Sequence, residues 1–461
     1  MDDRARALDA AAAHARRFLT TVDQRPVAAQ ADAVAIREAL GGDLPAHGED
    51  PAAVIAALAD GADPGLVASA GPRHFGFVIG GALPAALAAD WLVSAWDQCA
   101  AFHSLSPAAA AIEDVCAAWA LDLLGLPAEA SVGFVTGGQG ANTTALAAAR
   151  HAVLARAGWD VEQDGLTGAP RVTVVCGEQA HATIYTALRL LGLGAGSAIR
   201  VAADGQGRMR PEALADALAD CSGPVIVCAQ AGNVATGAFD PFEPIADLCE
   251  RHGAWLHIDG AFGLWAAAAP STRPLMTGAE RAASWAVDAH KWLNVPYDCA
   301  LAIVRDPAAH RGAMSLAAAY LVADPGQRDS TNYVPESSRR ARAVPVYAAL
   351  RSLGREGVAA LVERCCAHAR TMAARLAEVP GAAVLNDVVL NQVLVRFPGG
   401  DDANRAIVDA VQRDGTCWLG GTVWNGEAVV RVSFSSWATT TEDVERSAAA
   451  IARAGASVPA P

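Results

Sequence analysis

The sequence predicts an α/β protein with a mostly parallel central sheet, helices on both faces of that sheet, and a small C-terminal α+β lobe. Three observations support this prediction. Short apolar runs alternate with stretches of helical periodicity through the middle of the chain, which is typical of parallel strands joined by helices. Polar residues follow several of these runs directly. Nearer the C-terminus, longer helical stretches flank a few short strand-like runs.

The length of 461 residues allows two or three lobes. We expect a helical N-terminal arm over residues 1–75, a large domain over residues 76–325, and a mobile loop with a small C-terminal domain over residues 326–461. The arm is rich in alanine at helical spacing, and Gly41 and Pro64 lie in its two breaks.

Composition and charge exclude several classes of function. The net charge of −14 argues against a general nucleic-acid binder or a protein of anionic membrane surfaces. The longest uncharged stretch, residues 75–89, falls short of the ~18 apolar residues of a membrane span. The first residues are acidic and lack the apolar core of a secretory signal. The ten cysteines have neither disulfide nor metal-site spacing. We therefore expect a cytoplasmic protein without a metal.

The first half of the large domain begins with helical periodicity over residues 84–124. Ser106 can cap a second helix there, with Pro107 at its first position. A short apolar strand over residues 132–135 then leads into the Gly-rich turn Thr136-Gly-Gly-Gln-Gly-Ala-Asn142 and a helix over residues 143–154. Backbone N–H groups at such a helix start can bind an anion, although glycines of purely structural use explain the turn equally well.

After this turn the alternation becomes regular. The expected strands are residues 171–175, 199–201, 225–229, 255–258, 284–287 and 300–304, and the expected helices are residues 181–191, 211–218 and 244–251. A polar residue follows four of these strands, namely His181, Asn233, Asp259 and Lys291. Because ligands bind at the carboxyl ends of parallel strands, we expect these four side chains to contribute to one site.

Lys291 is the first candidate for chemistry. Burial lowers the pKa of a lysine and frees its amine for Schiff-base formation with a carbonyl compound. Asp259 could keep a pyridine nitrogen protonated, His181 could lie flat on the ring, and the Gly-rich turn could hold a phosphate, which are the groups that tune pyridoxal phosphate. Each residue also has a purely structural interpretation: Lys291 could be a surface lysine, Asp259 could cap a turn, and His181 could start a helix. Each of these alternatives explains one residue only.

The motifs together resemble the pyridoxal-phosphate-dependent decarboxylases of the aromatic-amino-acid and glutamate decarboxylase family. The resemblance runs from about Phe75 to the C-terminus and is carried by His257-Ile-Asp-Gly-Ala261, Asp288-Ala-His-Lys-Trp292, His181, and Gly232-Asn-Val-Ala-Thr-Gly-Ala-Phe-Asp240. It implies the aspartate-aminotransferase-like (type I) fold, pyridoxal 5′-phosphate as cofactor, an amino acid as substrate, and a homodimer with active sites at the subunit interface.

The resemblance also implies roles for individual residues. Lys291 would form the Schiff base, Asp259 would contact the pyridine nitrogen, and His181 and Ala261 would contact the two faces of the ring. The other cofactor-binding residues would be Gly138, Gln139, Asn233, Asp288 and His290. Many relatives have Asn where this chain has Asp288, and a carboxylate there repels a phosphate.

The expected substrate pocket is largely apolar, with Phe77, Phe102 and His103 in its wall. In the family, the segment over residues 99–103 enters the site of the neighbouring subunit. No cluster of residues for a second acidic group is evident, which favours an aromatic or bulky apolar amino acid. Arg431, in the middle of an expected strand, could bind the α-carboxylate, or it could pair with an acid.

The C-terminal lobe is expected to contain a helix over residues 344–376, strands over residues 391–397 and 429–434, and a hairpin turn at residues 418–422. A polar loop over residues 324–335 precedes it and contains Tyr333. Family members carry a loop tyrosine that protonates the substrate carbon after CO2 leaves, so Tyr333 is a candidate acid. A tyrosine that only packs on the surface is the alternative.

The predicted reaction is the decarboxylation of an L-amino acid to an amine and CO2. An aminotransferase or an aldolase or other lyase with the same cofactor remains an alternative, because fold and cofactor do not fix the reaction. A non-catalytic scaffold of the same fold is a remote alternative, against which the presence of Lys291, Asp259 and His181 argues.

Overall fold

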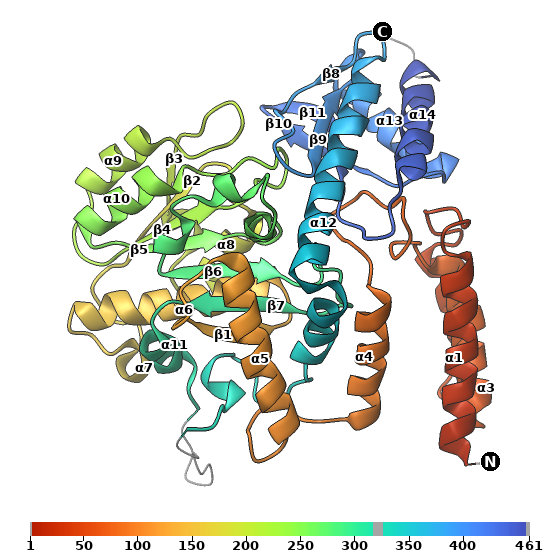
Figure 1. Ribbon diagram of the computed structural model, residues 1–461, viewed down its shortest axis with the longest axis horizontal. Helices are drawn as coiled ribbons and strands as arrows, with labels where there is room; N and C mark the ends of the chain where they lie inside the picture. The colour runs from red at the N-terminus through yellow and green to blue at the C-terminus, as the bar shows by residue number, and fades with distance from the viewer. Residues whose placement is uncertain (1, 317–325, 458–461) are drawn as a thin grey trace. The chain divides into compact units, whose positions relative to one another are not determined.

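The computed structural model describes residues 2–316 and 326–457, and the chain divides into two compact units (Figure 1). The central unit consists of Gly80–Arg370 and Asn386–Val393. The terminal unit takes in the residues up to Ile79, Thr371–Leu385 and the residues from Leu394 on. The expected boundaries at residues 75 and 325 stay a prediction, and the first two residues of the loop over residues 324–335 lie outside the described residues.

The central unit is built on a seven-stranded sheet in the order β1-β7-β6-β5-β4-β2-β3. Only β7 runs antiparallel to its neighbours, and the other adjacent pairs are parallel, which confirms the mostly parallel sheet. The strands are β1 (Ser131–Val135), β2 (Thr173–Gly177), β3 (Ile199–Val201), β4 (Val225–Gln230), β5 (Trp255–Asp259), β6 (Ser284–Asp288) and β7 (Ala300–Val304).

One strand is shifted by two residues from its expected range, and the other strands of this sheet agree with their expected ranges to within one residue. The first strand after the Gly-rich segment was expected over residues 171–175, whereas β2 begins at Thr173 and ends at Gly177. The register explains the shift, because Thr173 pairs with Val225, the first residue of β4. Pro224 precedes that residue and has no N–H group to extend the ladder.

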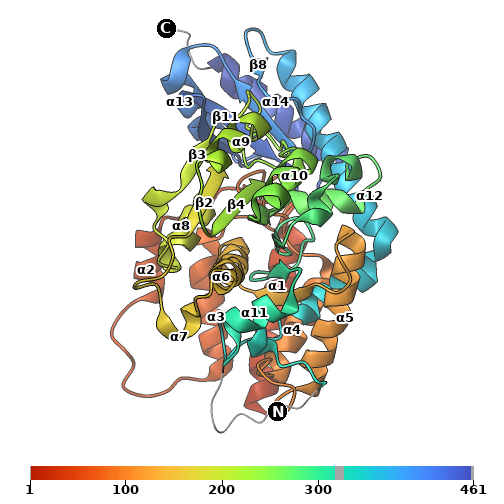
Figure 2. The ribbon, with the colours of Figure 1, turned by 90° about the vertical axis from the view of Figure 1, so that its left-hand side faces the viewer.

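Helices cover both faces of this sheet. The helices of this unit include α4 (Pro84–Trp96), α5 (Pro107–Leu124), α6 (Gly138–Arg156), α7 (Val161–Asp164), α8 (Ala182–Leu190), α9 (Pro211–Ala219), α10 (Phe242–His252) and α11 (Pro307–Met314). Side chains of α6, α8 and α11 share one hydrophobic core with β2, β4 and β5, and α9 and α10 lie on the other side of the strands (Figure 2). Every residue of β5 and β6 is therefore buried.

The turn in the Gly-rich segment is shorter than expected. We expected the turn to continue to Asn142, but α6 already begins at Gly138. The glycines do not break the helix, because neither Gly138 nor Gly140 has a positive φ angle. Gly138 instead leaves room for the side chain of Asp288, since a Cβ atom on Gly138 would lie 2.8 Å from Oδ2 of Asp288. The anion-binding start of α6 therefore lies directly at the end of β6.

A buried ionic cluster connects two loops of the central unit. Glu113, on α5, accepts hydrogen bonds from Arg328, Arg339 and Ser330. Burial alone would raise the pKa of Glu113, but the two guanidinium groups outweigh it and hold the pKa below its usual range. Arg339 also donates to the carbonyl of Ala100, so the cluster ties the loop before α5 to the segment over residues 328–339.

The terminal unit contains N-terminal helices and most of the second sheet, whose strand β9 begins in the central unit. The helices are α1 (Asp3–Thr21), α2 (Ala33–Leu40), α3 (Pro51–Ala62), α13 (Gly400–Asp414) and α14 (Thr441–Ser457). The sheet has the order β10-β11-β9-β8, with β8 (Ala383–Val384), β9 (Gln392–Arg396), β10 (Gly420–Trp424) and β11 (Glu427–Ser433). The long helix α12 (Ala343–Ala377) has a kink at Gly354 and ends within this unit. No helix among the described residues is long and apolar enough to cross a membrane.

The hairpin of this lobe turns later than expected. The turn was expected at residues 418–422, but β10 and β11 are joined by Asn425 and Gly426, which have φ angles of 50° and 84°. An Asn-Gly pair with positive φ at both residues matches the twist of a two-residue hairpin. The glycines at residues 420–421 belong to β10 instead.

Candidate active site

The candidate site lies where β5 and β6 end beside the start of α6. Asp259 is the last residue of β5, and Asp288 is the last residue of β6. The backbone N–H of Asp288 donates to the carbonyl of Ala261 at 2.8 Å, which holds the two strand ends together. Lys291 follows three residues after Asp288, so the structure brings these expected site residues into one place.

Lys291 forms an ion pair with Asp288. Its Nζ lies 2.9 Å from Oδ2 of Asp288, and the lysine side chain is 21% exposed. Lys291 is also the only lysine among the 35 basic residues of the chain, a signal that the motif-based reasoning did not use. Because arginine occupies every other basic position, Lys291 is the only side chain with a primary amine.

His290 lies on the other side of the Asp288 carboxylate. Its Nδ1 accepts the backbone N–H of Cys299 at 3.4 Å, so the proton of a neutral ring is on Nε2, which lies 3.5 Å from Oδ1 of Asp288. Burial lowers the pKa of His290 although the carboxylate opposes this effect. The ring of Tyr297 packs on the imidazole with a centroid distance of 4.5 Å.

Asp259 is held by three donors. Its Oδ1 accepts the backbone N–H of Ala261 at 3.2 Å, and its Oδ2 accepts Nδ2 of Asn142 at 3.1 Å and the hydroxyl of Thr183 at 3.5 Å. Asn142 comes from α6 and Thr183 from α8, and sequence reasoning missed both as partners of this carboxylate. Together they fix its orientation at the end of β5.

A chain of buried hydrogen bonds continues from Asn142 into the sheet. Because the Asn142 amide donates to Asp259, its oxygen accepts Nε2–H of His257 at 3.0 Å. Nδ1 of His257 then accepts the hydroxyl of Ser284 at 2.9 Å, and Nε1 of Trp255 donates to the same hydroxyl oxygen. Burial lowers the pKa of His257 to about 4, which keeps the ring neutral as this arrangement requires.

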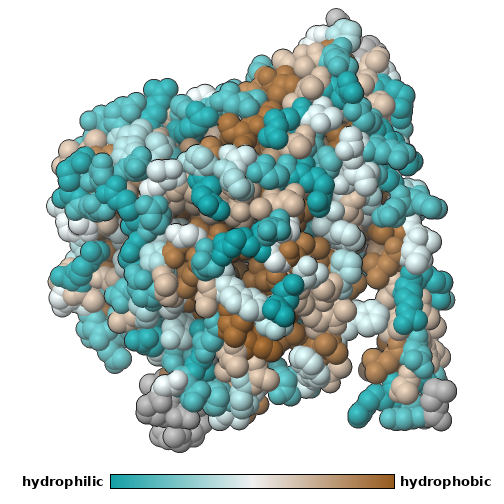
Figure 3. All heavy atoms as spheres, in the orientation of Figure 1, coloured by the Kyte–Doolittle hydropathy of each residue, from teal (hydrophilic) through white to brown (hydrophobic). Residues whose placement is uncertain are grey.

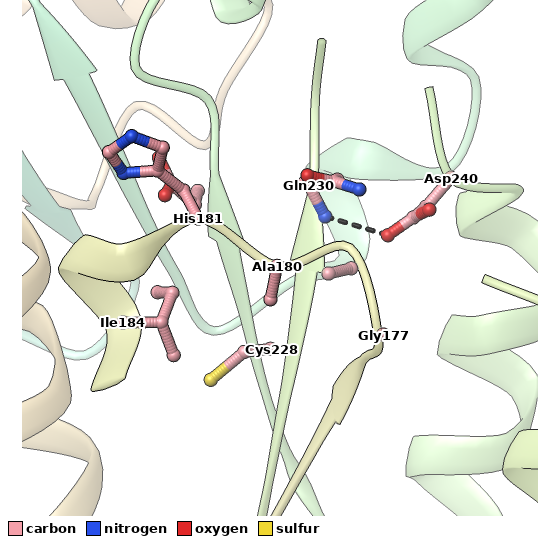
Figure 4. A pocket seen from close by; sticks show the side chains of 9 residues that line it. Gly177, Ala180, His181, Ile184, Cys228, Gln230 and Asp240 are labelled. Atoms are coloured by element: carbon pink, nitrogen blue, oxygen red, sulfur yellow. Dashed lines mark hydrogen bonds between the residues drawn. The ribbon is translucent and has the colours of Figure 1, made fainter. Parts of the chain in front are cut away.

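His181 is exposed and lies at the start of α8. Its Nδ1 accepts the backbone N–H of Thr183 at 3.3 Å, so the residue does cap the helix. It also lines a small pocket, together with Gly177, Ala180, Ile184, Cys228, Ala229, Gln230, Asp240 and Asp259. Figure 4 shows the imidazole on one side of this pocket and Gln230 and Asp240 on the other. Helix capping and a place beside Asp259 are therefore compatible.

Comparison with known proteins identifies this arrangement. The pyridoxal-dependent decarboxylase conserved domain matches residues 35–397. The chain belongs to the pyridoxal-dependent decarboxylase family. Its cofactor is pyridoxal 5′-phosphate, and its reaction is the decarboxylation of an amino acid.

Three similar proteins show how far the likeness extends. Tryptophan decarboxylase 1 of Oryza sativa subsp. japonica is 29% identical over 418 residues, which cover 81% of this chain and 78% of the relative. L-2,4-diaminobutyrate decarboxylase of Rhizobium meliloti (strain 1021) is 32% identical over 377 residues, covering 78% and 73%. The crystal structure of Oryza sativa TDC with PLP and tryptamine has the same fold, with a TM-score of 0.92, 24% identity, and coverage of 99% and 98%.

The site of this decarboxylase fits the cofactor at most positions. Asp259 offers an oriented carboxylate, Lys291 a primary amine, and Gly138 an open helix start where a Cβ atom would be crowded. Asp288 is the exception, because its carboxylate lies at the same helix start, where a phosphate would be expected. No group of metal-binding side chains gathers within the described part of the chain.

Two expected cofactor residues of the decarboxylase form hydrogen bonds with other parts of the protein. Oδ1 of Asn233 accepts the backbone N–H groups of Ala235 and Thr236 and thereby closes its own turn. Nε2 of Gln139 donates to the carbonyl of Thr183 at 3.4 Å, so this side chain is directed toward α8. Their roles in cofactor binding stay predictions.

Tyr333 packs beside β1 in the central unit, and its role as the acid stays a prediction. Its ring packs edge-on against His310 and under the guanidinium of Arg328, with centroid distances of 5.4 Å and 4.7 Å. His310 bonds to Ser131, the first residue of β1, whereas Gly137 and the candidate site follow the last residue of that strand. The backbone carbonyl of Tyr333 lies against Gly133, the middle residue of β1, so the residue packs alongside this strand.

The expected substrate pocket is divided between the two units. Phe102 and His103 are half-buried in the central unit, and the backbone N–H of His103 donates to Asp329 at 2.9 Å. Phe77 and Arg431 belong to the terminal unit, where burial lowers the pKa of Arg431. The pocket formed by these four residues stays a prediction.

Proposed function

We propose that this decarboxylase converts an aromatic or bulky apolar L-amino acid to the corresponding amine and CO2 at the cluster of Lys291, Asp288 and Asp259. The observation that supports this site most strongly is the junction of the ends of β5 and β6 with the start of α6, which gathers an amine, an oriented carboxylate and an anion-binding helix end. The similarity to tryptophan decarboxylase 1 and the apolar side chain of Phe102 support the substrate class.

We assign each of these side chains one task. The cofactor, when bound, supplies a conjugated ring that takes up the electron pair left by CO2. Lys291 provides the amine that bonds covalently to an aldehyde. Asp259, oriented by Asn142 and Thr183, would hold a proton at the pyridine nitrogen, and His181 and Ala261 would contact the two ring faces.

A proton must reach the substrate carbon after CO2 leaves. Tyr333 stays a candidate donor, and its ring packs against His310 and Arg328. His181 is the alternative donor, because it is exposed in the pocket that Asp259 lines. Amine formation by Tyr333→Phe at the wild-type rate would favour His181.

The substrate class can be tested by comparing kcat/KM for L-tryptophan, L-tyrosine and L-phenylalanine with kcat/KM for L-glutamate and L-2,4-diaminobutyrate. We expect the aromatic substrates to be preferred about tenfold or more, because an apolar pocket leaves a second charged group without a partner. A preference for glutamate or diaminobutyrate would contradict the proposed substrate class, while leaving the reaction unchanged.

We also propose that the enzyme works as a homodimer in which the segment over residues 99–103 enters the partner's site. The helices α1, α2 and α3 bury none of their residues in the described chain. Large apolar side chains of the central unit are exposed as well, namely Trp91, Leu92, Trp96 and Leu105, with exposed fractions of 43% to 56%. Figure 3 shows apolar residues gathered on the face where α4 and α5 lie. Contiguous exposed apolar surface favours an interface.

Sedimentation can test this assembly. The wild-type protein is expected to sediment as a dimer, and Trp91→Glu/Trp96→Glu as a monomer without activity, because buried charges would oppose association. Leu190→Glu is the matched control, since Leu190 is 67% exposed at the end of α8 and should not affect the dimer. A monomer with full activity would contradict the proposal. The cytoplasmic location also stays a prediction.

A further inference from the structure

Asp288 places a negative charge at the anion-binding end of α6. Its side chain is 2% exposed, and its Oδ2 would lie 2.8 Å from a Cβ atom on Gly138, the first residue of the helix. The first N–H groups of a helix have no partner within the helix and carry partial positive charge, so they attract anions. The Asp288 carboxylate thus occupies the kind of position that a phosphate takes.

The second oxygen of this carboxylate is unsatisfied. Oδ1 of Asp288 is buried and has no hydrogen-bond partner among the described residues. Nε2 of His290 is 3.5 Å away and forms no hydrogen bond with this oxygen. An unsatisfied buried oxygen is unfavourable and rare in folded proteins, so this side of Asp288 lacks a donor that would offset its charge toward an approaching anion.

The positive charge that compensates Asp288 comes from Lys291. The ion pair at 2.9 Å involves the amine that the proposed function assigns to the cofactor aldehyde. When that amine bonds to an aldehyde, the direct pairing with Asp288 changes at the same time as a phosphate arrives at α6. Cofactor binding therefore brings two anions together and alters the cation that balanced one of them.

We propose that Asp288 competes with the cofactor's phosphate for the start of α6 and thereby sets how tightly this decarboxylase holds pyridoxal phosphate. The inference rests on the proposed function, which places the aldehyde at Lys291. It makes Asp288 a determinant of cofactor affinity and exchange. A neutral side chain of similar size should bind the phosphate more tightly, because like charges a few ångströms apart repel strongly at a partly buried site.

The affinities for pyridoxal phosphate and for pyridoxal, which lacks the phosphate, separate this effect from changes at Lys291. Both compounds offer the same aldehyde to Lys291, so any effect of Asp288 on the lysine cancels in the ratio of the two dissociation constants. We expect Asp288→Asn to raise the preference for pyridoxal phosphate over pyridoxal by about tenfold or more, measured by equilibrium dialysis of the apoprotein. Asp288→Ser, which also removes the charge, should shift the ratio in the same direction.

Asp220→Asn is the matched control, because Asp220 is exposed at the end of α9 and its replacement changes the net charge equally. For this control, the ratio of the dissociation constants for pyridoxal phosphate and pyridoxal should equal that of the wild type. An unchanged or lowered preference for the phosphate compound in both Asp288 variants would overturn the inference, and Asp288 would then only position Lys291 and His290. Failure of the wild type to bind either compound would instead overturn the assigned cofactor site, and this inference with it.

Discussion

Lys291→Ala is expected to lower the rate of amine and CO2 formation by roughly 10³-fold or more, comparable to the removal of other catalytic nucleophiles. Lys291 is the only lysine in the chain, so no second lysine can replace it. The variant should fold, because the side chain is partly exposed and lies after β6 rather than within it. Steady-state assays of CO2 and amine, with circular dichroism as a check of folding, test the prediction.

Lys291→Arg is the matched variant for the charge. It keeps a cation beside Asp288, but an arginine stays protonated and does not form the covalent bond. Both variants are therefore expected to be inactive, and neither should retain cofactor after borohydride reduction. In the wild type, reduction should label the peptide that contains Lys291. A label only at the N-terminal amine, or a Lys291→Arg variant with wild-type turnover, would contradict the assignment.

Asp259→Ala is expected to reduce kcat by about 10²–10³-fold and to weaken cofactor binding, because an electrostatic partner at the site of developing charge is lost. Three donors hold the carboxylate in place, from Ala261, Asn142 and Thr183. Steady-state kinetics together with cofactor titration measure both effects.

Asp259→Asn separates charge from packing. The asparagine keeps the size of the side chain and can still accept the N–H of Ala261, but it carries no charge. We expect it to lose nearly as much activity as Asp259→Ala. Near-normal turnover of either variant would show that Asp259 does not have the proposed role. Asn142→Ala should have a smaller effect than both, since it removes one of the three donors.

Local sequence patterns predicted the strands of the central sheet well. The ranges for β3 and β7 agree with the structure residue by residue, and β7 is an uninterrupted apolar run that stops before Arg305. The start of β2 was wrong because its partner strand, which begins at Val225, decides where the ladder starts. The hairpin turn was misplaced although Asn425-Gly426 is a strong local signal for it.

The candidate site could be predicted only in part. The positions of Asp259 and Lys291 after strands follow from the alternation of strands and helices, because parallel strands bring their carboxyl ends together. The donors Asn142 and Thr183 come from two helices far apart in the sequence, so only tertiary packing reveals them. The place of Tyr333 beside His310 depends on long-range packing in the same way.

The most direct test of the central claim is the joint measurement of CO2 and amine from an aromatic L-amino acid labelled at its carboxylate carbon, with purified protein and pyridoxal phosphate. We expect labelled CO2 and the corresponding amine in equal amounts, and neither product with Lys291→Ala. Formation of a keto acid without labelled CO2, or equal product yields from the wild type and Lys291→Ala, would contradict decarboxylation at this site.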